Sequence, residues 1–323
     1  MLIKRKMLDV ICVGSATVDK FLNVEESLAH LHLGDKILVK GQEIHSGGGA
    51  TNAAATFSLF GLKTGIITKL GNDHYADFIQ KELKENNIKN LVKSKSKKHT
   101  DSSTLIASRK DRDRIILVHK EASLDLISKD INFSSLKKAK WVYLATLVGK
   151  SETVAKKIAK YVNENNINLL FNPSLYLAKQ GTKKLKIFLD ASKIIILNKE
   201  EAQELLKDNK SNIKKLLKKL NRLSPEISII TNGNKKLNAF DGNKFYSVVP
   251  PDVPVRHTAG SGDAFNSGFL AGMIKGYDIE KALQIGVANA SSVVQHLGTK
   301  NKLLSEKQAL SFIRRHKIKV IKR

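Results

Sequence analysis

From about residue 140 onward, short apolar runs alternate with longer segments that have helical periodicity. Strands are predicted at 141–144, 168–171, 193–197 and 227–230, and helices near 151–165, 199–207 and 211–222. This alternation predicts an α/β fold, with a mostly parallel central sheet and helices on both faces. Ligands of such sheets usually bind at the carboxyl ends of the strands.

The first 120 residues follow a different pattern. After a predicted strand at 9–14, β-like runs occur near 36–45, 103–108 and 114–119, and the last two are joined by a polar turn at 109–113. These runs lack crossover helices, which favours antiparallel pairing outside the main sheet. We therefore expect a small β lobe beside the α/β part.

Composition is that of a folded globular protein. The chain has 323 residues, of which 41% are hydrophobic, enough to bury a core without disulfides. The single cysteine, Cys12, lies in an apolar run, so an intramolecular disulfide is impossible and a reducing cytoplasm is expected. No apolar run approaches the roughly 18 uncharged residues that a membrane helix needs. We expect one domain over residues 1–323, with a basic tail before the first strand.

The formal net charge of +26 is the most unusual bulk property. Such a charge can indicate binding to nucleic acid, anionic membranes or phosphorylated ligands. The lysines, however, are spread over nearly every predicted helix, and aromatic residues, only 6% of the chain, do not interleave with basic runs. Base stacking requires such interleaving, so no specific nucleic-acid partner is expected.

The segment from His257 to Phe265 combines glycines with an acidic residue just before an apolar helix. Gly260 and Gly262 allow the backbone to approach an anion closely, and the start of the helix favours negative charge. Asp263 is poorly suited to bind phosphate but well suited to take a proton from an attacking hydroxyl. An anion site next to a base is what phosphoryl transfer requires, although a glycine loop with a capping Asp is an equally simple interpretation.

A second glycine cluster, Gly47-Gly48-Gly49, also leads into a predicted helix. By itself it would indicate only a flexible loop. Two such junctions more than two hundred residues apart suggest binding sites for two ligands.

Together with shorter motifs, these two clusters resemble the ribokinase-like (PfkB) carbohydrate kinases. The motifs occur in family order over roughly residues 8 to 300: Gly14 to Asp19, Gly47 to Ala54, Asn198-Lys199-Glu200-Glu201, Thr231-Asn232-Gly233 and Thr258 to Asp263. One such motif would be weak, but five in order are highly specific. The resemblance implies a ribokinase-like α/β fold whose β-like runs, from about 15–45 and 100–120, form a lid over the substrate.

The resemblance also implies roles for single residues. The base would be Asp263, with the amides of Gly260, Ser261 and Gly262 as the anion hole. The substrate pocket would be lined by Asp19, Gly47, Gly48 and Asn52. ATP and Mg²⁺ would be held by Asn198, Glu201 (the residue nearest the metal), Thr231, Gly233 and Asn289. The implied reaction is transfer of the γ-phosphate of ATP to a primary hydroxyl of a sugar.

Three departures from the family pattern concern the substrate and a cation. His257 stands where many members carry an Asp that helps to bind a monovalent cation, which argues against activation by such an ion; a loop histidine with a backbone hydrogen bond is expected instead. Gly49 and Val148 replace a lysine and a carboxylate of ribose-specific members. Free ribose is therefore not expected as the substrate unless other groups hold it.

Several alternatives stay open at this stage. A nucleoside kinase or a sugar-phosphate kinase would use the same machinery, and a non-catalytic binding protein of the same fold is the alternative from another class. The charged turn with Arg109, Arg112 and Arg114 is either a solvated hairpin tip or a group that reaches a substrate phosphate. A homodimer formed through the edges of the lid is also possible.

Overall fold

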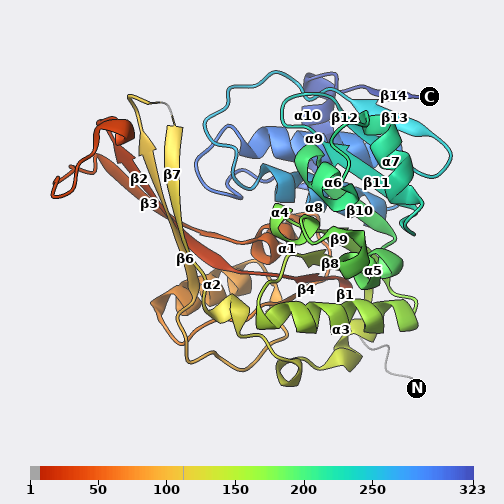
Figure 1. Ribbon diagram of the computed structural model, residues 1–323, viewed down its shortest axis with the longest axis horizontal. Coiled ribbons are helices and arrows are strands. Elements are labelled where there is room, and N and C mark those ends of the chain that lie inside the picture. Colours follow the sequence, from red (N-terminus) through yellow and green to blue (C-terminus); the bar gives the residue numbers. More distant parts are fainter. Residues whose placement is uncertain (1–7, 112) are drawn as a thin grey trace.

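A ten-stranded sheet forms the centre of the computed structural model (Figure 1), which describes residues 8–111 and 113–323. The predicted basic tail and Arg112 lie outside these residues. In spatial order the strands are β14 (Val320–Lys322), β13 (Phe245–Val248), β12 (Leu237–Phe240), β11 (Ile227–Thr231), β10 (Ile194–Asn198), β9 (Asn168–Asn172), β8 (Ala139–Ala145), β1 (Leu8–Val13), β4 (Thr64–Ile67) and β5 (Lys89–Asn90). The strands from β11 to β5 are parallel to their neighbours, which confirms the predicted α/β class. The antiparallel extension β12–β14 was not predicted.

Side chains of the central strands alternate between two hydrophobic cores, one on each face of the sheet. Val10 and Cys12 of β1 enter one core, and Ile11 and Val13 enter the other, as the two-residue period of a strand requires. The first face is covered by α1 (Gly49–Leu59), α2 (His74–Glu85), α8 (Ser261–Ile274), α9 (Ile279–Val293) and α10 (Glu306–Arg315). The second is covered by α3 (Lys150–Glu164), α4 (Leu175–Ala178), α5 (Gly181–Ala191), α6 (Lys199–Leu206) and α7 (Ile213–Asn221).

A second, four-stranded sheet projects from this body beside the start of α1 (Figure 1). Its order is β3 (Gly41–Gly47), β2 (Thr17–Val24), β6 (Asp101–Ser108) and β7 (Asp113–His119). The hairpin β6–β7 and the pair β2–β3 are antiparallel as expected, but β2 and β6 are parallel. The expectation of purely antiparallel pairing was wrong, because β2 and β6 both leave the main body in the same direction although they are far apart in sequence.

Short 3₁₀ turns connect the larger elements, at Leu28–His30, Ala122–Leu124, Ser128–Asp130 and Phe133–Lys138. Among the helices of the described residues, none is both long and apolar enough to cross a membrane.

Candidate active site

The helix α8 begins at the loop that contains the predicted anion hole. Gly260 is its N-cap, with a φ of 80°, and a side chain at this position would collide with the carbonyl oxygen of Thr299. Glycine is therefore required both by conformation and by space. The first-turn N–H groups of a helix have no intrahelical acceptor, and here that of Ser261 donates to the carbonyl of Thr258 at 3.3 Å. The open space lies at Gly262, where a Cβ would meet no atom within 4 Å.

Asp263, in the first turn of α8, is held by a chain of two hydrogen bonds. The Asn52 Nδ2 donates to Asp263 Oδ2 at 2.9 Å, and the Asn52 Oδ1 accepts from the Thr299 hydroxyl at 3.0 Å. The hydroxyl fixes which end of the amide faces the carboxylate. Burial raises the pKa of Asp263, and the hydrogen bond from Asn52 opposes that rise. The result is an oriented carboxylate with an increased affinity for a proton.

The two glycine junctions meet at this carboxylate. Gly49 is the first residue of α1, and a Cβ there would lie 3.7 Å from Asp263 Oδ1 and 3.0 Å from the Cβ of Ala145. Gly48 precedes it with a φ of 97°, and its missing Cβ would lie 2.5 Å from the Ser15 carbonyl oxygen. The sequence placed both junctions correctly at helix starts, and the fold brings them into contact.

Asp19, on β2, lies against the backbone of Gly47. A side chain at Gly47 would collide with the Asp19 carboxylate, which is only 6% exposed. Asp19 Oδ1 accepts hydrogen bonds from Ser103 at 2.6 Å and Thr17 at 3.1 Å. Burial raises the pKa of Asp19, against the effect of these hydrogen bonds and of the nearby positive charge of Lys300. This buried acceptor suits a ligand that offers hydroxyl donors.

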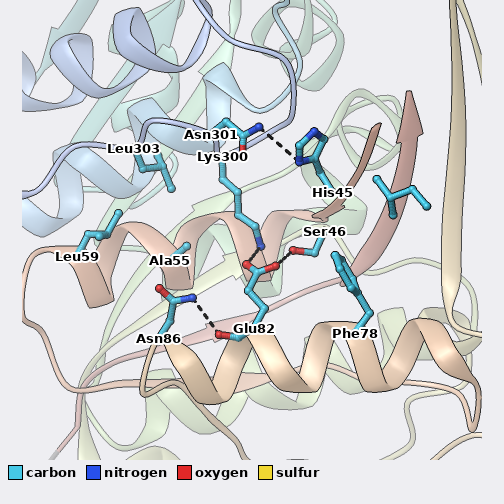
Figure 2. A pocket seen from close by; sticks show the side chains of 11 residues that line it. His45, Ser46, Ala55, Leu59, Phe78, Glu82, Asn86, Lys300, Asn301 and Leu303 are labelled. Carbon is cyan, nitrogen blue, oxygen red and sulfur yellow. Dashed lines mark hydrogen bonds and ion pairs between the residues drawn. The ribbon is translucent and has the colours of Figure 1, made fainter. Parts of the chain in front are cut away.

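Close to Asp19 lies an ion pair between Lys300 and Glu82 that the sequence analysis did not predict. Figure 2 shows Lys300 reaching down to Glu82 of α2, which also accepts the hydroxyl of Ser46. These groups line a cavity of about 280 Å³, at whose rim Asn301 meets His45 at 3.4 Å. The cluster ties the end of β3 to α2 and to the segment after α9. Nothing local marks Lys300 or Glu82, because both belong to ordinary charged stretches of sequence.

A second group of predicted residues lies at the ends of β10 and β11. Asn198 caps α6: its side chain accepts from the Glu201 N–H, and the Glu201 carboxylate accepts from the Asn198 N–H, both at 2.8 Å. Such a reciprocal capping box explains the Asn-x-x-Glu spacing locally. The register of the strands pairs Asn198 with Thr231, and Gly233 follows in open space with a φ of 58°. Burial raises the pKa of Glu201 to about 7, helped by the charges of Glu200 and Asp263.

Asn289 is placed differently from the other predicted nucleotide-side residues. It is fully buried in α9, and its Oδ1 accepts from the Leu304 N–H at 2.8 Å. Its Nδ2 has no partner among the described residues, and a Cβ at Gly268 would lie 3.1 Å from that atom. The side chain thus lies between α8 and α9, and its contact with a nucleotide stays a prediction.

His257 lies three residues before Gly260, as a buried loop histidine. Its Nδ1 accepts from the Ala259 N–H at 3.2 Å, the kind of backbone hydrogen bond expected from the sequence. Burial lowers the pKa of His257, and the charge of Arg114 lowers it further. Both effects favour the neutral form of the ring.

No cluster of three or more His, Cys, Asp or Glu side chains is placed to hold a metal among residues 8–111 and 113–323. Mg²⁺ in phosphoryl-transfer sites is usually held by one or two carboxylates together with the phosphates of the substrate. Glu201, a partly buried carboxylate beside the ends of β10 and β11, is of the chemical type that such a site uses.

Known proteins resemble this chain over nearly its whole length. A model of the pfkB family carbohydrate kinases matches residues 7–306. A ribokinase from Bacillus subtilis is 26% identical over 296 residues, which cover 90% of this chain and 94% of that protein. A nucleoside kinase from Methanocaldococcus jannaschii is 25% identical over 316 residues, covering 97% and 99% of the two chains.

The fold is shared with solved structures. The Arabidopsis thaliana ribokinase complexed with ribose and ATP superposes with a TM-score of 0.81 at 20% identity, over 95% of this chain and 99% of that one. At this identity the likeness establishes the fold, while the family match covers nearly the whole chain. The chain belongs to the PfkB family of carbohydrate kinases.

Proposed function

We propose that this kinase transfers the γ-phosphoryl group of ATP to a primary hydroxyl of a sugar or a related small molecule, with Asp263 as the base. The observation that carries the proposal is the contact of Asn52 with Asp263. It joins the acceptor-side junction at α1 to the phosphate-side junction at α8. A base between an acceptor pocket and an anion site has the arrangement that phosphoryl transfer requires.

In the proposed step, Asp263 takes the proton of the acceptor hydroxyl while the hydroxyl oxygen attacks the γ-phosphorus. The bond from that phosphorus to the bridging oxygen breaks, and ADP leaves with the electron pair. The amides of Gly260, Ser261 and Gly262 stabilise the charge on the transferring group. Because the Ser261 N–H already donates to the Thr258 carbonyl at 3.3 Å, we assign the larger share of this charge stabilisation to the amides of Gly260 and Gly262.

On the acceptor side, Asp19 would accept hydrogen bonds from hydroxyls of the sugar. Gly47 and Gly48 would let the acceptor approach the backbone, and Asn52 would orient the base as well as line the pocket. We propose that the β2–β3–β6–β7 sheet is the lid of a single kinase domain. Its closure would exclude water and suppress hydrolysis of ATP.

On the nucleotide side, Asn198 and Glu201 would hold Mg²⁺ and its waters, and Thr231, Gly233 and Asn289 would lie along the nucleotide. When bound, Mg²⁺ would neutralise charge on the phosphates. The edge strand β7 exposes Leu117 and Val118 at 55% and 60%, which supports the proposal that two copies pair through their lids.

The test is the variant Asp263→Asn, assayed by coupled ADP release against sugars, sugar phosphates and nucleosides. Asn keeps the shape of the side chain and can still accept from Asn52 but cannot take a proton. We expect turnover to fall by roughly 10²–10⁴-fold, the range for loss of a general base, with nucleotide affinity nearly unchanged. Asp9→Asn, at a partly exposed ion pair with Lys140, is the matched control and should keep full turnover. Near wild-type turnover in Asp263→Asn would contradict the assignment.

A further inference from the structure

A second cavity, of about 520 Å³, lies between the inner face of the small sheet and the segment that leads into the Gly260 loop. Phe21 of β2 and Leu105 of β6 line it, and the two are direct partners in the sheet. They follow Asp19 and Ser103 by two residues, so they share the face of those side chains. At about 3.3 Å per residue, the cavity begins roughly 7 Å outward from Asp19 along the strand. A bound acceptor that extends beyond Asp19 would enter it.

The lining of this cavity is strongly basic. It contains Lys40, Arg109, Arg114 and Arg256, and Glu25 is the one carboxylate among the described residues that line it. Glu25 already pairs with Arg109 at 3.3 Å. The net charge of the lining is therefore positive after this internal pairing, which favours a ligand group of negative charge.

Arg114 is the half-buried member of this basic set and joins it to the proposed phosphate loop. Its Nη2 donates to the Thr258 hydroxyl at 3.3 Å, two residues before Gly260. This contact crosses from β7 to the loop before α8, so the guanidinium is positioned over the cavity from the lid side. A guanidinium in a fixed position is well suited to bind phosphate or carboxylate through paired hydrogen bonds.

His257 supplies an independent observation at the same place. It lines the cavity, is 7% exposed, and accepts at Nδ1 from the Ala259 N–H. The neutral ring then carries its proton on Nε2, and this buried atom has no hydrogen-bond partner within the described part of the chain. Buried donors are nearly always paired, so a donor without an acceptor points to a ligand oxygen.

The cavity is separate from the proposed nucleotide side. Of the described residues that line it, none belongs to the strand ends of Asn198 and Thr231. Most lysines are dispersed over helices, loops and turns elsewhere in the molecule, whereas these cations converge from the loop after β2, the β6–β7 hairpin and the loop before α8. If the basic residues only formed a solvated surface, the exposed position of Lys40 would be accounted for. The hydrogen bond from Arg114 to Thr258 and the buried His257 Nε2, which has no partner among the described residues, would not be.

We propose that this cavity binds a second anionic group of the acceptor, a phosphate or a carboxylate, at the end away from the hydroxyl that is phosphorylated. The proposal rests on the proposed function and narrows it to anionic sugars. Arg114 and Arg256 supply the charge, and His257 supplies a neutral donor. Arg114, from the charged turn described in the sequence analysis, then binds the anionic group of the acceptor.

The experiment compares acceptors in matched pairs, each with a free primary hydroxyl: fructose 6-phosphate with fructose, and gluconate with glucitol, extended to other sugar phosphates, aldonates and nucleosides. We expect the highest kcat/KM for an anionic member, on the order of tenfold or more above its neutral partner, the factor that one charged hydrogen bond supplies. Preference for the phosphate or for the carboxylate identifies the group. A neutral sugar or a nucleoside as the best acceptor would overturn the proposal.

Variants of the cavity test which side chains bind the anionic group of the acceptor. Arg114→Gln and Arg256→Gln should each raise KM for the anionic acceptor and lower the anionic-to-neutral ratio of kcat/KM by on the order of tenfold. Arg222→Gln, at the end of α7, is the control and should keep the ratio. An equal loss on both acceptors would show a structural role for these arginines and contradict the proposal.

Measurements of binding distinguish failure of the anionic site from failure of the proposed kinase activity. Calorimetry with Asp263→Asn should show that the preferred anionic compound binds more tightly than its neutral partner, without any turnover. If no compound of the panel is phosphorylated by the wild type, the proposed function is contradicted, and the same calorimetry still decides the anionic site. Equal binding of both partners would overturn the site alone.

Discussion

The two glycine-to-helix junctions look alike in sequence but differ in what surrounds their glycines. At α1, Gly47 and Gly48 are packed against Asp19 and the Ser15 carbonyl, so their small size is needed for these close contacts. At α8, Gly260 is packed in the same way against Thr299, but Gly262 faces open space. A glycine with free space around it has no packing reason to lack a side chain. Its backbone is accessible to an anion, which makes the second junction the better candidate for phosphate.

The largest effect is expected from Gly47→Ala. The new Cβ would collide with the Asp19 carboxylate, and overpacking of this kind costs about 1–3 kcal/mol. Thermal melting should show a lower Tm, and the KM for the acceptor should rise because Asp19 is displaced. A variant with unchanged Tm and KM would show that the α1 junction tolerates a side chain.

For Gly262→Ala we expect the opposite effect on stability. The new Cβ meets no atom within 4 Å, and alanine is the better helix former, so Tm should stay the same or rise slightly. Turnover should nevertheless fall, because the methyl group stands beside the amide that an anion would approach. Loss of Tm without loss of turnover would reverse the roles given to the two junctions.

Glu201 allows a test at the ends of β10 and β11. Its pKa is about 7 in the folded protein against an ordinary value of 4.5, so between these values the folded state holds a proton that the unfolded state has lost. Stability therefore falls as the pH rises from 4.5 to 7 and stays lower above 7. Glu201→Gln removes this loss and keeps the capping hydrogen bond, so its Tm should exceed that of the wild type at pH 8 but not at pH 4.5, in buffer with a chelator. The same gain at both pH values would contradict the pKa assignment.

The smallest effect is expected from a change of monovalent cation. The loop before Gly260 is held by the His257–Ala259 and Arg114–Thr258 hydrogen bonds, and the guanidinium charge disfavours a second cation nearby. Replacement of K⁺ by tetramethylammonium at constant ionic strength should leave the rate of ADP release nearly unchanged. A large loss of rate would indicate that an ion site exists in spite of His257.

Much of the local structure could be predicted from the sequence. The apolar runs and helical periodicities from 140 onward gave the parallel strands and their helices, because both signals depend on near neighbours. Asn198 and Glu201 were paired through the resemblance to the family's Asn-x-x-Glu motif, and the structure shows that this spacing forms a capping box. The antiparallel strands β12 to β14 were missed, since strands of three or four residues carry weak periodicity.

The contacts of the site could not be predicted in the same way. The bond from Asn52 to Asp263, the Lys300–Glu82 pair and the docking of Arg114 on Thr258 each join segments that are far apart in sequence. The parallel pairing of β2 with β6 is also long-range. Such contacts depend on how whole elements pack, and no local pattern encodes the partner of a charged side chain.

The sequence by itself determined the family, the elements and the position of Asp263 at the start of a helix. Only the tertiary structure decided that Asp263 is oriented by Asn52, that Gly47 is needed for space while Gly262 is open, and that basic side chains converge beyond Asp19. The physical reason is that secondary structure follows from short-range periodicity and backbone hydrogen bonding. Orientation, burial and the resulting charge of a site arise only when distant segments exclude water together.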